Sequence, residues 1–117
     1  MHYWNVKLKK KATKEEVLDA FKTSSRIKLI HYDQGLVSNN TIKEMYLDMG
    51  RPWGDMYEVA LWEDMLKVVG DELFYAYVVD NQAIVIPETI DAIRALTGIE
   101  RDGHTSIAKT NKSLGIN

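Results

Sequence analysis

The segment YEVALWEDMLKVVGDELFYAYVV, residues 57–79, decides the fold class of this chain. It holds three short apolar runs, at residues 57–62, 65–69 and 72–79, which are rich in the β-branched and aromatic residues that favour strands. The Gly70-Asp71 step between the second and third runs is typical of a tight hairpin. The segment therefore predicts three consecutive strands, of which the last two form a hairpin.

Two more strands are predicted closer to the N-terminus. Residues 26–32, RIKLIHY, alternate between two faces, and the turn residues 33–35 close this strand. Residues 2–9 alternate as well, which is typical of a half-buried strand because successive side chains point to opposite faces. One face of that strand carries His2, Trp4, Val6 and Leu8, and the other carries Tyr3, Asn5, Lys7 and Lys9.

Two helices are predicted between these strands. Thr13 and Glu16 have the spacing of a capping box, so a helix starts there and ends near residues 23–25. The second helix starts within residues 38–41, where several side chains are suited to the N-cap. Thr41 with Glu44 forms a second capping box, and Gly50 marks the end of this helix. Residues 50–55, GRPWGD, predict a structured turn.

The last third of the chain is predicted to be helical. Residues 83–86 form a short apolar run that is either a last strand or a buried lead into a helix. Pro87 suits the first turn of that helix, which continues to Gly98. A final short helix over residues 105–114 has a thin apolar stripe, so it needs another surface to pack against.

These elements predict a single α+β domain over residues 1–117, with a mostly antiparallel or mixed sheet and helices packed on one face. Hydrophobic residues make up 45% of the chain and charged residues 27%, the balance of an ordinary globular domain. The net charge of -2 gives no general attraction to nucleic acid or anionic membranes. The apolar runs are too short to span a bilayer, and we expect a cytoplasmic protein.

Composition and motifs also exclude several kinds of site. The chain has no cysteine, which excludes disulfides, thiolate metal sites and a cysteine nucleophile. His2, His31 and His104 lack metal-ligand spacing, so no metal site is predicted, and no glycine-rich phosphate loop is present. His31 with Tyr32 and Asp33 is either an acid–base cluster or a strand end that bonds to solvent. The residues alone indicate an α+β domain and no specific chemistry.

Three stretches add more because they resemble a known family. MGRPWGDMYEVALWED at residues 49–64, VIPETIDAIRAL at residues 85–96 and SIAKTNKSLGI at residues 106–116 resemble consecutive landmarks of one enzyme family. That family is the archaeal-type (type II) phosphorylating glyceraldehyde-3-phosphate dehydrogenase, and the landmarks belong to its C-terminal portion. The resemblance extends over nearly all 117 residues and includes the opening, where the family has a strand of the type M-H-x-H-x-V.

The resemblance implies a homotetrameric enzyme that oxidises glyceraldehyde 3-phosphate with NAD or NADP and inorganic phosphate. In that family a cysteine thiolate attacks the aldehyde and a histidine serves as the base. It also implies that residues 1–98 are part of the catalytic domain, that residues 99–117 are a C-terminal helical tail, and that Met1 is an internal position of the parent family. We therefore expect the chain to lack its N-terminal dinucleotide-binding (Rossmann) portion, and to bind no cofactor and be inactive alone.

Few site residues follow from the resemblance. His2 matches the first histidine of the M-H-x-H pattern and is the candidate base, while Trp4 stands at the second histidine. Asn81 and Gln82 fall where the family has a polar turn beside the cofactor; they either contact the nicotinamide amide or form a plain turn. The alternative function is a stand-alone, non-enzymatic module for self-association or partner binding.

Overall fold

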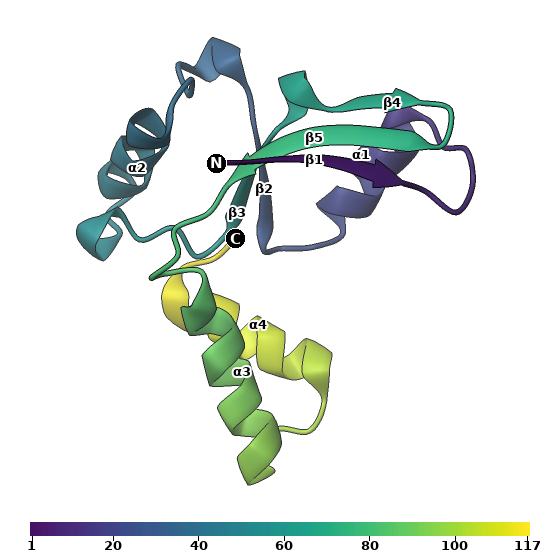
Figure 1. Ribbon diagram of the computed structural model, residues 1–117. Helices are drawn as coiled ribbons and strands as arrows, with labels where there is room; N and C mark the ends of the chain where they lie inside the picture. Colours follow the sequence, from purple (N-terminus) through teal and green to yellow (C-terminus); the bar gives the residue numbers. More distant parts are fainter.

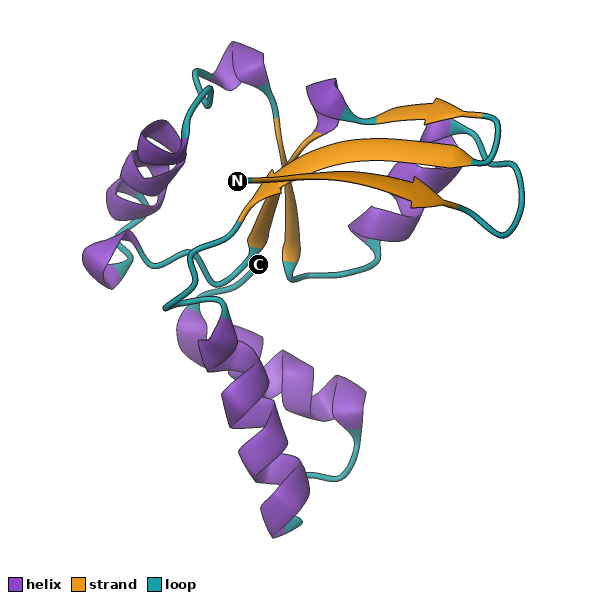
Figure 2. Ribbon diagram, in the orientation of Figure 1, coloured by secondary structure: helices purple, strands orange, loops and turns teal.

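The computed structural model describes residues 1–117 and contains one five-stranded mixed sheet and four α-helices (Figure 1). All the strands belong to this sheet, and short 3-10 turns join several of the elements (Figure 2). The elements in chain order are β1 (His2–Lys7), α1 (Lys14–Lys22), β2 (Ile27–Ile30), α2 (Asn39–Asp48), β3 (Val59–Trp62), β4 (Lys67–Val69), β5 (Glu72–Val78), α3 (Val85–Thr97) and α4 (Gly103–Leu114).

The strand order is β1-β5-β3-β2, and β4 also pairs with β5. β5 is antiparallel to β1, β3 and β4, whereas β2 and β3 are parallel. Val69 lies opposite Glu72, so β4 and β5 are joined by the two residues Gly70 and Asp71. This register confirms the predicted hairpin. β1 lies at one edge of the sheet and β2 at the other.

The α+β class and the mixed sheet are confirmed, but the helices divide between the two faces of the sheet. Ala60 and Trp62 of β3 pack in one cluster with Ile42 and Tyr46 of α2. Leu61, between them in the strand, belongs to a second cluster with Val17 and Leu18 of α1. Because neighbouring strand residues point to opposite faces, α1 and α2 cover different faces, whereas the sequence predicts the helices on one face.

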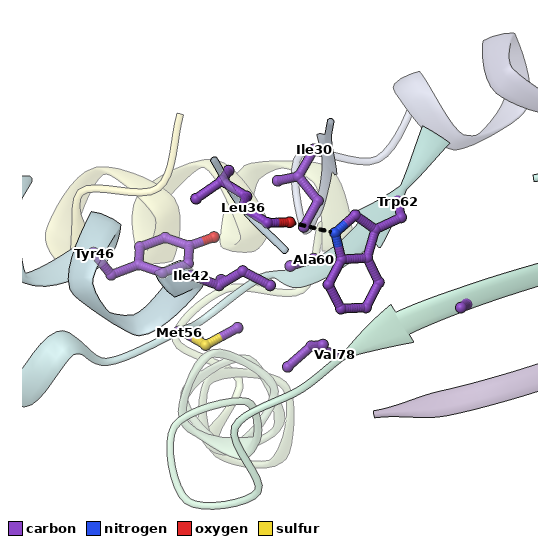
Figure 3. Close-up of a cluster of buried hydrophobic side chains, with 9 residues drawn as sticks. Ile30, Leu36, Ile42, Tyr46, Met56, Ala60, Trp62 and Val78 are labelled. Carbon is purple, nitrogen blue, oxygen red and sulfur yellow. Dashed lines mark hydrogen bonds between the residues drawn. The ribbon is translucent and has the colours of Figure 1, made fainter. Parts of the chain in front are cut away.

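Trp62 is the largest fully buried side chain and belongs to the cluster under α2 (Figure 3). Its indole Nε1 donates a hydrogen bond of 2.7 Å to the carbonyl oxygen of Leu36. This bond satisfies the one polar atom of the indole and ties the loop before α2 to the end of β3.

The N-termini of α1 and α2 can be compared with the two capping boxes predicted from the sequence. Thr13 and Glu16 form the predicted capping box at α1. At α2 the N-cap is Ser38, whose hydroxyl accepts from the amide of Thr41, and the Thr41 hydroxyl accepts from the amide of Ser38. The predicted capping box of Thr41 with Glu44 is therefore wrong, because the helix starts three residues earlier and Thr41 already lies in its first turn.

Residues 83–86 lead into α3 and are not a strand, which settles the two alternatives left open by the sequence. α3 and α4 pack against each other as a pair beyond one end of the sheet (Figure 1). α4 begins at Gly103, two residues before the predicted start, with Asp102 as its N-cap. The division into residues 1–98 and 99–117 stays a prediction.

Arg26 connects this helical pair to the sheet. It lies just before β2 and donates hydrogen bonds to Glu88 (2.6 Å) and Asp91 (2.7 Å) of α3 and to Asn111 (3.1 Å) of α4. The buried positions of α4 are polar, Ser106 and Thr110, and both hydroxyls donate to the Asp91 carboxylate. α4 is thus held by hydrogen bonds where its apolar stripe is thin. None of the helices is both long and apolar enough to cross a membrane.

Candidate functional site

His2, the candidate base, lies at the start of the edge strand β1 and is exposed. It pairs across the sheet with Tyr77 of β5, and the two rings are stacked with centroids 5.2 Å apart and planes inclined by 23°. Within the chain the His2 imidazole forms no hydrogen bond or ion pair. Its ring nitrogens are therefore free to exchange a proton with a bound molecule or with water.

Four ring side chains lie together on one face of the sheet, and we call them the aromatic ledge: His2, Trp4, Tyr75 and Tyr77. The indole Nε1 of Trp4 donates a hydrogen bond of 3.0 Å to the hydroxyl of Tyr77. Tyr75 stacks on Tyr77 with centroids 6.0 Å apart. Through this hydrogen bond and the ring stack with His2, Tyr77 holds both His2 and Trp4 in place.

The predicted cofactor contacts lie in the turn that follows β5. The carboxylate of Asp80 accepts hydrogen bonds from the amides of Gln82 (3.0 Å) and Ala83 (3.4 Å), which fixes the backbone of this turn. The ammonium nitrogen of Lys43 in α2 also lies 3.7 Å from a carboxylate oxygen of Asp80. The side chains of Asn81 and Gln82 are exposed and form no hydrogen bond within the chain.

The structure brings these three predicted residues to one end of the sheet but not into contact. His2 pairs with Tyr77, and the turn with Asn81 and Gln82 begins shortly after that residue. The roles of His2, Asn81 and Gln82 stay predictions. What the geometry provides is a free imidazole and two free amides at the same end of the sheet.

A buried ion pair between Arg51 and Glu58 lies away from these residues, and the sequence did not predict it. The guanidinium donates to both carboxylate oxygens of Glu58, at 2.6 Å and 2.5 Å, and the two side chains are only 7% and 6% exposed. Arg51 also donates to the carbonyl oxygens of Asp55 and Gly115, each at 3.2 Å. The pair joins the turn after α2 to the start of β3 and to the C-terminal segment.

Two tyrosine rings enclose this ion pair. The guanidinium carbon of Arg51 lies 4.7 Å from the ring centroid of Tyr46 and 5.0 Å from that of Tyr57. Burial alone lowers the pKa of Arg51, but the hydrogen bonds and the charge of Glu58 raise it above its usual value. Burial also raises the pKa of Tyr46. Both groups therefore keep their ordinary charge states, and the pair is a structural element.

His31 forms the second cluster of titratable side chains. It follows β2, and its Nε2 lies 3.1 Å from Glu63, while its Nδ1 lies 3.8 Å from Asp64. Both carboxylates follow β3, which runs parallel to β2, so the ends of the two strands meet at the same edge. One alternative predicted from the sequence is an acid–base cluster of His31 with Tyr32 and Asp33. In the structure the carboxylates beside His31 are instead those that follow β3.

The comparisons with known proteins concern the whole chain. No family model matches it. The chain is 40% identical to the glyceraldehyde-3-phosphate dehydrogenase of Methanobrevibacter smithii over 99% of its own length and 35% of that protein. It is 42% identical to the glyceraldehyde-3-phosphate dehydrogenase of Pyrococcus furiosus and 40% identical to glyceraldehyde-3-phosphate dehydrogenase 2 of Methanosarcina barkeri, in each case over 99% of the chain and 34% of the relative.

The chain thus spans about a third of the length of the curated relatives it matches. This share is consistent with the C-terminal portion that the sequence motifs predict. Over almost all of its length, the chain is similar to archaeal glyceraldehyde-3-phosphate dehydrogenases, as its motifs predict.

Proposed function

We propose that this chain is the C-terminal catalytic and tetramer-forming portion of an NAD(P)-dependent, phosphorylating glyceraldehyde-3-phosphate dehydrogenase. The observation that carries the proposal is about 40% identity to several enzymes of that name over nearly the whole chain. The proposed setting is the cytoplasm, in glycolysis or gluconeogenesis. The proposed substrates of the complete enzyme are glyceraldehyde 3-phosphate and inorganic phosphate.

The proposed contribution of this chain to the chemistry is a base. A general base needs an accessible nitrogen and a fixed position, because proton transfer depends on distance. His2 meets both conditions, since its imidazole forms no bond within the chain and its ring rests on Tyr77. The nucleophile has to come from outside these residues, because the chain contains no cysteine.

The fit of the chain to a nicotinamide cofactor is partial. The exposed amides of Asn81 and Gln82 have the donors and acceptors that a nicotinamide carboxamide requires. The chain has no glycine-rich loop to bind the cofactor's phosphates. In this proposal Asn81 or Gln82 orients the nicotinamide end of the cofactor, and the N-terminal dinucleotide-binding portion binds the rest and supplies its hydride-transfer chemistry. We expect the 117-residue chain alone to be inactive.

Complementation tests the proposal. The chain would be co-expressed with the part of the Methanobrevibacter smithii relative that it does not cover. NAD and NADP reduction would then be followed with glyceraldehyde 3-phosphate in the presence and absence of phosphate. We expect a complex with phosphate-dependent activity, which is lost in His2→Ala and retained in His104→Ala. A complex that does not form, or activity that survives His2→Ala, contradicts the proposal.

A second candidate is a stand-alone module that associates with itself or with a partner. The observation that favours it is the edge strand β1, where Tyr3 is 69% exposed and Trp4 48% exposed. Unpaired edge strands with apolar side chains promote pairing with another chain. Light scattering of the purified chain tests the self-associating form of this candidate, which requires a stable oligomer without any N-terminal portion. Together with the complementation assay it separates the candidates, because only the enzyme portion should also restore activity.

A further inference from the structure

A cavity of about 300 Å³ lies along the free edge of β2, and none of the predicted site residues His2, Asn81 and Gln82 lines it. Its walls come from the end of α1 and the segment that follows it, from β2 and from the segment after α2, and Glu58 and Asn117 complete them. This volume is at the lower end of the range for small-molecule sites, which run from roughly 300 to 1,000 Å³. A ligand of a few heavy atoms fits it, and a dinucleotide does not.

The charged side chains around the cavity are mainly cationic. Lys22, Lys28 and Arg51 line it, and Glu58 is the one acidic side chain among its walls. Arg51 and Glu58 neutralise each other through their paired hydrogen bonds. Neither Lys22 nor Lys28 has a carboxylate within 4.0 Å, and the Lys28 ammonium lies 5.7 Å from the ring centroid of Tyr46. Two positive charges therefore remain available to a ligand.

Two hydroxyl groups add neutral donors to these charges. Ser24 Oγ accepts a hydrogen bond of 3.3 Å from the amide of Arg26, and Ser25 Oγ accepts one of 2.7 Å from the side chain of Asn111. An oxygen that accepts in this way still has its own hydrogen to donate. Neither hydroxyl donates to another group of the chain, so each has a free O–H donor, and both residues line the cavity.

The cavity also has an apolar part, formed by Ile27, Leu29 and Met49. Lysine ammonium groups and hydroxyl donors suit the oxygens of a phosphate, and an apolar wall suits a short carbon skeleton. From this combination we propose that the cavity binds a small phosphorylated organic ligand, with the phosphate held by Lys22, Lys28 and the serine hydroxyls. This inference is independent of the proposed dehydrogenase function, because it uses none of the residues named there.

The test is a titration of the ¹⁵N-labelled chain with phenyl phosphate and with inorganic phosphate at constant ionic strength, followed by NMR. We expect saturable shifts of the amides of Ser24, Ser25 and Lys28, with tighter binding of phenyl phosphate because its ring contacts the apolar wall. Each of Lys22→Gln and Lys28→Gln should weaken binding about tenfold, the loss expected for one hydrogen bond to a charged group.

Lys67→Gln is the matched control, because Lys67 is an exposed lysine of β4 without an ion pair and does not line the cavity. It removes the same charge and should leave the dissociation constant within about twofold. The spectra of all three variants also report whether the fold is kept. Shifts that do not saturate, or an equal loss in Lys67→Gln, would overturn the proposal, since both indicate general attraction of anions to the surface.

Discussion

Arg51 and Glu58 form a two-point ion pair in the interior of the protein, with N–O distances of 2.6 Å and 2.5 Å. The six residues between them contain the turn that follows α2, so the pair closes this turn from inside. Through the carbonyl oxygen of Gly115 the same guanidinium also binds the C-terminal segment. One arginine thus connects three parts of the chain that are separate in sequence.

Removal of one partner should be far more damaging than removal of both. Glu58→Gln leaves the guanidinium of Arg51 buried without its counter-charge, and we expect the free energy of unfolding to fall by about 3–5 kcal/mol. The double variant Arg51→Met/Glu58→Met buries no charge and should recover much of this loss. Urea unfolding followed by circular dichroism measures both.

Asp71→Asn is the control for this comparison. It removes the carboxylate from an exposed ion pair, in which the ammonium nitrogen of Lys7 lies 3.8 Å from a carboxylate oxygen of Asp71. Exposed ion pairs contribute little, so a change below about 1 kcal/mol is expected. If Glu58→Gln and Asp71→Asn lower the free energy of unfolding by the same amount, then burial does not make the ion pair of Arg51 with Glu58 more stabilising than an exposed pair.

Local features of the fold could be predicted from the sequence because their partners are close along the chain. The capping box of Thr13 with Glu16 and the Gly70-Asp71 hairpin are of this kind. The start of α2 lies within the predicted residues 38–41, but the capping box was assigned to Thr41 with Glu44, because these residues offer several capping side chains and only the structure shows that Ser38 is the one that accepts. The parallel pairing of β2 with β3 depends on long-range packing, so the sequence left it open and the two helices were assigned to one face.

The candidate site was predicted less completely, for a related reason. The strand that carries His2 follows from its alternating pattern, but the stack on Tyr77 depends on the register between β1 and β5. The ion pair of Arg51 with Glu58 gave no usable signal, because charged residues in a turn are usually solvated. The contact of His31 with Glu63 could be found only once β2 and β3 were known to be parallel neighbours.

Asp91 should make the stability of the protein depend on pH. Burial raises the pKa of this carboxyl, but hydrogen bonds from Ser106, Arg26 and Thr110 outweigh it and lower the pKa below its usual value. A carboxylate with a lowered pKa stabilises the folded state above the unfolded pKa of about 3.9, and this contribution is lost as the pH falls through the lower folded value.

Asp91→Asn should therefore lower the free energy of unfolding by about 1.5–3 kcal/mol at pH 7, the value of hydrogen bonds to a charged group. The difference from the unaltered chain should shrink when the pH is lowered below about 4. Asp19→Asn, on the exposed side of α1, is the control and should change the free energy of unfolding at pH 7 by less than about 0.5 kcal/mol. If Asp91→Asn lowers the free energy of unfolding by the same amount at pH 7 and at pH 3, the stabilisation does not come from the Asp91 carboxylate.

The turn after α2 contains two glycines that separate backbone strain from crowding. Gly50 and Gly54 both have positive φ, +86° and +67°. A Cβ at Gly54 would lie 3.0 Å from side-chain atoms of Leu47 and Lys43 and from the carbonyl oxygen of Lys43, whereas a Cβ at Gly50 would have nothing within 4 Å. The two positions therefore differ in the space around them.

Gly50→Ala should cost about 1 kcal/mol, since only the left-handed backbone is unfavourable. Gly54→Ala should cost at least about 1 kcal/mol more, because the carbonyl of Lys43 belongs to α2 and cannot move aside. The midpoints of urea unfolding at unchanged slope give both values. Equal costs would mean that the turn shifts away from α2 and relieves the contact.

Positions 2 and 4 of β1 can be distinguished in the complemented enzyme. His2→Phe keeps a ring on Tyr77 but removes the imidazole, so the fold should be retained while kcat falls by about 100-fold or more, the usual contribution of a general base. Trp4→His places an imidazole at the second position of the family pattern and breaks the bond from Trp4 to Tyr77. If His2 is the base, this change should not increase activity. A rise in kcat with Trp4→His, together with activity that survives His2→Phe, would assign the base to position 4.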